Sequence, residues 1–197
     1  MSQSTLIFAT HNAHKLEEVK AMLSATNVDL ISLSELGYNQ DIAETGDTLL
    51  KNASIKSQTI YKAKGQSVFA DDSGLEVMAL DMAPGVHTAR YAGEAKDNQA
   101  NMRKLLQALE KKTYRTARFR TVISLIWKGE EHFFEGIVNG KIAHREAGAG
   151  GFGYDPVFIP YGYDETFATL PLEVKNGISH RYRAICQMQK FIELQLS

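Results

Sequence analysis

Apolar residues recur along the chain with two spacings, and each spacing predicts one kind of element. Short continuous apolar runs are typical of buried strands, and they occupy residues 6–10, 28–33, 67–72 and 157–160. Apolar residues three and four positions apart predict amphipathic helices from Asn12 onward and over 46–64, 97–112 and 179–196. Two longer segments, 117–127 and 132–142, predict an antiparallel hairpin around 128–131. This order of elements predicts an α/β fold with a mixed sheet flanked by helices.

The composition fits one soluble globular domain, because 44% of the 197 residues are hydrophobic and 23% are charged. The formal net charge of −1 argues against a general nucleic-acid-binding protein. The sequence shows neither a secretory signal nor an apolar run long enough to cross a bilayer, and so predicts a cytoplasmic protein. Cys186, the single cysteine, is predicted to be a packed core thiol in the last helix.

The segment between the first strand and the first helix carries Thr10, Asn12 and Lys15. Backbone N–H groups point outward at a helix start, and together with a hydroxyl, an amide and a lysine they form a natural anion site. An ordinary Asn N-cap beside a solvated lysine fits the same residues. Glu18 is predicted to lie off the apolar face of this helix.

Carboxylates lie at the ends of two further predicted elements. Asp71 and Asp72 end a predicted strand before Ser73, where open α/β folds usually bind ligands, and strand alternation directs the two carboxylates to opposite sides. An Asx-type turn is the structural alternative. Glu44 begins the predicted helix that carries Lys56, where the helix dipole also favours an acid. Such oxygen ligands suit Mg²⁺, which takes one or two carboxylates with phosphates and water.

The stretch GAGGFGYDP, residues 148–156, holds four glycines, two aromatic residues and a carboxylate. Its glycines match G-x-G-x-x-G, but Pro156 and a predicted strand follow, so the dinucleotide-binding fingerprint is excluded. The basic run at 111–120 is interpreted as a helix end and the exposed side of a strand.

Basic residues also cluster where the last helix is predicted to begin. Ser179 is expected to cap that helix, and Lys175, His180 and Arg181 bring donors to its start. Cations in a first helical turn oppose the helix dipole, which indicates an anionic or acceptor-rich partner.

These segments together resemble those of the noncanonical purine nucleoside triphosphate pyrophosphatases, the inosine and xanthosine triphosphatase group. The resemblance rests on TxNxxK at 10–15, ETGxT at 44–48, ADDSGLEV at 70–77, PGVHTARYAG at 84–93, GGFGYDPVF at 150–158 and KNxISHRxxA at 175–184. It covers the whole chain in order.

The resemblance implies an enzyme that hydrolyses ITP, dITP and XTP to the nucleoside monophosphate and pyrophosphate with Mg²⁺. Such enzymes keep deaminated purines out of DNA and RNA. It also implies a homodimer, and a single domain over residues 1–197 with an elongated mixed sheet and two lobes around an active-site cleft. Neither nucleic acid nor a membrane is expected as a partner.

The resemblance also implies a role for each matching residue. Glu44 and Asp72 would bind the metal and orient the attacking water, with Asp72 as general base. The triphosphate would be held by Thr10, Asn12, Lys15, Lys56 and Ser73. The base would be held by Phe152, Gly153, Tyr154, Asp155, Lys175, His180 and Arg181.

The chemistry of a purine fits these base-binding residues. Phe152 offers a ring for stacking, and Gly150, Gly151 and Gly153 would let the backbone approach the base. Arg181 and the backbone would donate to a 6-keto oxygen, which adenine replaces with an amino group. In that case a donor would meet a donor, and the site is therefore expected to reject ATP.

The chain departs from the family pattern at three positions outside the predicted site. His11 replaces a common glycine, Lys51 stands where many members carry Glu, and Thr169 stands where an acid is common. His11 and His14 are expected on the surface, because no zinc motif surrounds them.

Three other functions fit less well. A related pyrophosphatase for modified pyrimidine nucleotides is disfavoured by the GGFGYDP and SHR segments. A nucleotide-binding regulator without catalysis is disfavoured because Glu44 and Asp72 are both present. A nucleic-acid-binding module is disfavoured by the net charge.

Overall fold

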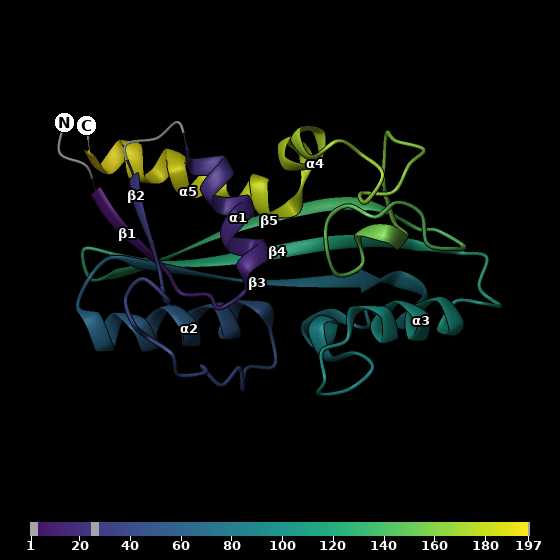
Figure 1. Ribbon diagram of the computed structural model, residues 1–197, viewed down its shortest axis with the longest axis horizontal. Helices are drawn as coiled ribbons and strands as arrows, with labels where there is room; N and C mark the ends of the chain where they lie inside the picture. Colours follow the sequence, from purple (N-terminus) through teal and green to yellow (C-terminus); the bar gives the residue numbers. More distant parts are fainter. Residues whose placement is uncertain (1–3, 25–27, 197) are drawn as a thin grey trace. The chain divides into compact units, whose positions relative to one another are not determined.

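The computed structural model describes residues 4–24 and 28–196, and its elements follow the predicted order with one additional helix, α4 (Figure 1). The strands are β1 (Ser4–Phe8), β2 (Val28–Ser32), β3 (Val68–Val77), β4 (Thr116–Trp127), β5 (Glu130–Ile142) and β6 (Phe158–Pro160). The helices are α1 (Ala13–Leu23), α2 (Leu49–Lys64), α3 (Asn98–Ala108), α4 (Leu172–Ile178) and α5 (His180–Leu196). Short 3-10 helices are η1 (Met78–Leu80), η2 (Gly85–Arg90) and η3 (Asp155–Val157).

The strands form one mixed sheet in the order β2-β1-β3-β4-β5-β6. β1 pairs in parallel with β2 and β3, whereas β5 and β6 are antiparallel. β4 and β5 are joined by Lys128 and Gly129, whose φ angles are 51° and 93°. Positive φ at both positions is typical of a type I′ hairpin turn. The mixed α/β fold and the hairpin predicted from the sequence are therefore confirmed.

The chain folds into two compact units. The first unit comprises Met1–Asp72, Thr121–Gly136 and Arg181–Ser197, and the second comprises Ser73–Arg120 and Ile137–His180. β3, β4 and β5 contribute residues to both units.

Strand pleating divides the core of the first unit into two clusters. Leu6, Phe8 and Phe69 pack with α1 and α5, whereas Ile7 and Val68 pack with α2. Alternate residues of a strand point to opposite faces, so each strand supplies both clusters. Figure 1 accordingly shows α1 and α5 on one side of these strands and α2 on the other.

A third cluster forms the core of the second unit. Leu75 and Val77 of β3 and Phe119 of β4 pack against Met102 and Leu105 of α3. The N-terminus of α3 is capped by Asp97, whose carboxylate accepts hydrogen bonds from the backbone N–H groups of Gln99 and Ala100. None of the helices in the described part of the chain is long and apolar enough to span a membrane.

Several local predictions are wrong. α2 begins at Leu49, with Thr48 as its N-cap, so Glu44 lies in irregular structure before the helix. β3 runs on to Val77, because the pleat continues through the Ser-Gly pair, so the two aspartates lie inside the strand and form no Asx turn. Cys186 is partly exposed, since it faces away from the cluster that its helix neighbours join.

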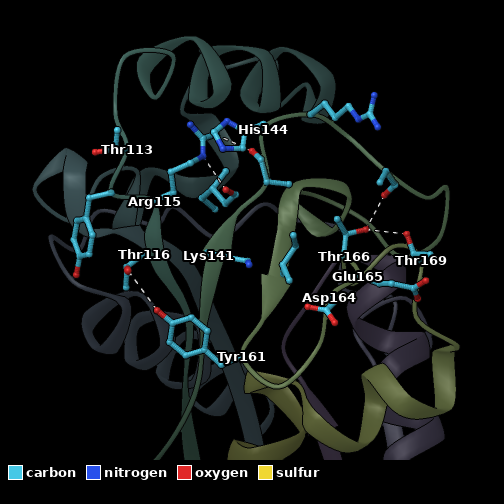
Figure 2. Close-up of a pocket in the computed structure, with 16 residues that line it drawn as sticks. Thr113, Arg115, Thr116, Lys141, His144, Tyr161, Asp164, Glu165, Thr166 and Thr169 are labelled. Atoms are coloured by element: carbon cyan, nitrogen blue, oxygen red, sulfur yellow. Dashed lines mark hydrogen bonds between the residues drawn. The ribbon is translucent and has the colours of Figure 1, made fainter.

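Arg115, in the basic run, is also buried, contrary to the sequence interpretation. Its Nε, Nη1 and Nη2 donate to the carbonyl oxygens of Ile142, Leu109 and Ala143 at 2.7–2.8 Å, which explains how the charge is accommodated. Figure 2 shows this side chain at a cavity of about 700 Å³ in the second unit. Across the described residues, the lining of this cavity includes none of the predicted site residues.

Candidate active site

Asp71 and Asp72 are consecutive residues of β3 whose carboxylates meet cations from different helices. Asp71 binds Lys15 of α1 and Arg181 of α5. Asp72 faces Lys56 of α2. Since these helices cover opposite faces of the strand, the alternation that the sequence predicted is confirmed.

Asp71 is the centre of a buried ion network. Its Oδ1 lies 3.0 Å from Nζ of Lys15, and its Oδ2 lies 3.1 Å from Nε of Arg181. Nη1 of Arg181 donates to Glu18, which is also buried. Burial alone would raise the pKa of the Asp71 carboxyl, but Lys15 and Arg181 outweigh it and hold that pKa well below its usual range. Asp71 is therefore a permanent anion at neutral pH.

Asp72 has a weaker cationic partner. Its Oδ1 lies 3.5 Å from Nζ of Lys56, and the same ammonium donates to Oε1 of Glu44 at 2.7 Å. Burial raises the pKa of Asp72, and the attraction of Lys56 offsets only part of that effect. Burial opposes the charge of Lys56, but Asp72 and Glu44 prevail and raise its pKa. The structure thus joins three of the predicted residues: Glu44, Lys56 and Asp72.

The predicted anion site lies at the start of α1. Asn12 is the N-cap, and its Oδ1 accepts a hydrogen bond from the backbone N–H of Lys15 at 3.2 Å. Oγ1 of Thr10 accepts from the N–H of Asn12 at 3.1 Å. The N-cap expected from the sequence is confirmed, and the Lys15 side chain is largely buried rather than solvated. Burial lowers the pKa of Lys15, and Asp71 compensates in part. Ser73, also predicted to bind phosphate, follows Asp72 in β3 and is partly buried.

The second unit brings together three of the predicted base-binding residues. Nζ of Lys175 donates to Oδ2 of Asp155 at 2.6 Å, and both side chains are buried. The same carboxylate oxygen accepts from the backbone N–H of Phe152 at 2.9 Å. The Lys175 ammonium lies 5.1 Å from the centre of the Phe152 ring, within cation–π range. These contacts fix the orientation of the loop that follows the glycines.

Two other predicted base-binding residues lie in the core of the same unit. The Tyr154 hydroxyl donates to the carbonyl oxygen of Thr88 at 3.0 Å, and burial raises the pKa of this phenol. The His180 ring stacks on Phe119 with a centroid distance of 4.7 Å and an interplanar angle of 11°. Both rings are almost fully buried, which gives each a packing role.

The glycines of the 148–156 stretch make room mainly for the protein itself. A Cβ at Gly148 or Gly150 would lie within 3 Å of the backbone of Ala168. A Cβ at Gly151 would lie 2.1 Å from Oδ2 of Asp155. Gly153 has a φ of 64°, and no atom lies within 4 Å of the place that a Cβ would take there, so it alone among these four glycines borders open space. The interpretation that Gly150 and Gly151 are bare for the sake of the base is therefore corrected.

Comparisons with known proteins place the chain in one family. Residues 6–191 match the Ham1 family. The chain belongs to that family. It is 53% identical to a dITP/XTP pyrophosphatase of Porphyromonas gingivalis, with 95% of this chain and 96% of the relative covered. It is 46% identical to the dITP/XTP pyrophosphatase of Bacillus subtilis, over 95% of this chain and 96% of the relative.

Solved Ham1 proteins have the same fold. The Ham1 protein of Staphylococcus aureus matches with a TM-score of 0.88 and 42% identity, and covers 98% of this chain and 100% of its own. The family predicted from the motifs, and the fold class with it, are confirmed.

The start of the last helix differs in part from the prediction for this Ham1 chain. Lys175 belongs to α4, a helix that the sequence did not predict. Ser179 directly precedes α5 with an extended backbone, which is the N-cap position expected for it. The donors of Lys175 and Arg181 therefore do not share a first helical turn. Nε and Nη1 of Arg181 donate to Asp71 and Glu18 within the first unit, and its contact with a base remains a prediction.

Glu18, which accepts a hydrogen bond from Arg181, was predicted wrongly from the sequence. It is 8% exposed, although the helical pattern put it off the apolar face. It is buried because Arg181 neutralises it. Two features of the sequence could have indicated that Glu18 is buried. It lies three residues after Lys15, and it is adjacent to the core residue Val19.

Proposed function

We propose that the protein hydrolyses ITP, dITP and XTP to the nucleoside monophosphate and pyrophosphate with Mg²⁺, and thereby clears deaminated purines from the nucleotide pool. Its class, a nucleoside triphosphate pyrophosphatase, follows from the Ham1 family and from relatives named dITP/XTP pyrophosphatases. The substrates, the metal and the residue roles are our proposal. So are the homodimer, the cytoplasmic location and the lack of nucleic-acid or membrane partners.

The observation that carries the proposal is the convergence of Glu44 and Asp72 on one ammonium. Both carboxylates lie within 3.5 Å of Nζ of Lys56. Both carboxylates therefore border one cationic position, and Mg²⁺ usually takes one or two carboxylates together with phosphates and water. Phosphates and water would complete the coordination of the metal. The site therefore fits Mg²⁺, with Glu44 and Asp72 as its ligands.

Asp72 is the residue best suited to accept a proton. A general base works best when its pKa lies near the operating pH, and in the metal-free protein burial raises the pKa of Asp72. Asp71 is unsuited, because its two cations keep its pKa low. We assign Asp72 to the water that attacks the triphosphate, with Glu44 helping to orient that water. When bound, Mg²⁺ would neutralise charge on the phosphates.

The phosphates are assigned to Thr10, Asn12, Lys15, Lys56 and Ser73. The start of α1 presents backbone N–H groups with partial positive charge, which favours a phosphate there. The two lysines would add full charges, and transfer of a phosphoryl group depends mainly on such electrostatic stabilisation.

The base is assigned to Phe152, Gly153, Tyr154, Asp155, Lys175, His180 and Arg181. Phe152 is partly exposed, and its aromatic ring is of the kind on which a purine stacks. The buried pair of Asp155 and Lys175 holds the Phe152 backbone in place. Gly153 adds open space beside it.

The proposal is tested by measuring products from dITP, XTP, dGTP and dATP, each with Mg²⁺ and with excess EDTA. We expect pyrophosphate and monophosphate from dITP and XTP, no release in EDTA, and at least about tenfold slower turnover of dATP. Orthophosphate as the main product would contradict the reaction. Equal turnover of dATP would contradict the assigned base selectivity.

A further inference from the structure

His11 links the loop before α1 to a distant segment of the first unit. Its Nε2 lies 3.0 Å from the carbonyl oxygen of Gln40, a residue 29 positions away. Its ring lies 6.5 Å from the ring of Tyr38 at an interplanar angle of 18°. A carbonyl oxygen accepts hydrogen bonds and cannot donate them, so His11 carries its proton on Nε2 and is the donor.

The segment that receives this hydrogen bond carries Glu44. Residues 38–48, here called the Glu44 segment, contain neither helix nor strand. At one end the N–H of Tyr38 donates to the carbonyl of Leu33 at 2.9 Å, and near the other the N–H of Gly46 donates to Oδ1 of Asn52 at 2.8 Å. An irregular segment has no regular ladder of backbone hydrogen bonds, so individual contacts decide where its residues lie. The contact at Gln40 falls between these two ends.

The other end of the link is the loop assigned to the phosphates. His11 stands between Thr10 and Asn12, whose own hydrogen bonds form the start of α1. The side chain of His11 is exposed and turned toward the Glu44 segment, so it spans two parts of the candidate active site from outside.

We propose that His11 is a positioning residue, which through its Nε2–H holds the Glu44 segment against residues 10–15 at the start of α1. A carboxylate assigned to the metal and groups assigned to the phosphates are thereby kept at a constant separation. This role rests on the proposed function, and His11 acts through the loop rather than on substrate. Small misplacements of reacting groups are costly in catalysis, which is why such a link matters.

Three substitutions separate the contributions of the ring and the donor. His11→Ala removes both, His11→Phe keeps a ring beside Tyr38, and His11→Gln keeps an N–H donor of similar reach. We expect His11→Ala and His11→Phe to speed backbone hydrogen exchange in residues 38–48 of the metal-free protein about fivefold, equivalent to ~1 kcal/mol. His11→Gln should restore slow exchange. Exchange in α3, which belongs to the other unit, should be the same in all variants.

The same variants are then assayed with dITP over a range of Mg²⁺ concentrations. His11→Ala and His11→Phe should need about fivefold more Mg²⁺ for half-maximal rate, and His11→Gln should behave like the unaltered protein. Unchanged exchange in His11→Ala, or recovery with Phe instead of Gln, would overturn the role of His11. If the unaltered protein fails to hydrolyse dITP, the proposed function falls, while the exchange experiment still decides whether His11 holds the segment.

Discussion

Asp71 and Asp72 are adjacent in β3, yet they have opposite electrostatic surroundings. Asp71 binds two cations, Lys15 at 3.0 Å and Arg181 at 3.1 Å, and its pKa is depressed. Asp72 has Lys56 at 3.5 Å, a cation that it shares with Glu44, and its pKa is raised by burial. One strand thus presents a structural anion on one face and a candidate proton acceptor on the other.

Replacing Asp71 should destabilise the protein. Asp71→Asn removes the negative charge that Lys15 and Arg181 share, and a buried cation left with too little opposite charge is costly. We expect the free energy of unfolding to fall by about 3 kcal/mol, measured by urea denaturation. The control is Asp47→Asn, which breaks the exposed pair with Lys51 and should leave stability nearly unchanged. Similar effects of the two substitutions would contradict the network.

Replacing Gly151 should disturb the base-binding loop. In Gly151→Ala the new Cβ would lie 2.1 Å from Oδ2 of Asp155, the oxygen that also accepts from Lys175 and from the Phe152 N–H. We expect kcat/KM for dITP to fall at least about tenfold. Gly65→Ala, outside the residues assigned to the substrate, is the matched control, because its φ is 65° against 69° at Gly151 while nothing lies within 4 Å of the place that its Cβ would take. Its backbone strain is therefore similar, at ~1–2 kcal/mol, without the clash. Equal losses in both variants would assign the effect to strain alone.

Stability should depend on pH through Glu131. Burial favours the protonated form, but hydrogen bonds from Ser54, Ser124 and Gln58 outweigh it and lower the pKa of this carboxyl. A depressed pKa stabilises the folded state above the ordinary pKa of about 4.3, and this contribution is lost as the pH falls through the folded value. The stability difference between the unaltered protein and Glu131→Gln should therefore be largest near pH 7 and shrink below about pH 4.5. A difference that stays constant from pH 7 to pH 4 would count against this assignment.

The sequence was most informative where a local rule decided the outcome. Alternation along β3 predicted the opposite faces of the two aspartates, and the N-cap rule predicted the role of Asn12. The sequence was misleading where the decisive partner is distant in the chain. Arg115 can be buried because its N–H groups donate hydrogen bonds to carbonyl oxygens as far along the chain as Ala143, and no local pattern shows this.

The glycine-rich stretch shows the same limit. Gly148 and Gly150 are required by the backbone of Ala168, which folds back from about twenty residues further along the chain. The motif alone identified the family correctly, whereas the interpretation that Gly150 and Gly151 make room for the base was wrong.

The proposed role of Asp72 is tested most directly by measuring pyrophosphate release from dITP in the presence of Mg²⁺, for the unaltered protein and for Asp72→Asn. Equilibrium binding of dITP to both proteins is measured in parallel. Asparagine keeps the shape of the side chain and cannot accept the proton of the attacking water. We predict rapid, metal-dependent release by the unaltered protein and at least about a thousandfold loss in Asp72→Asn, with dITP still bound. Turnover by Asp72→Asn within about tenfold of the unaltered rate would show that Asp72 is not the base.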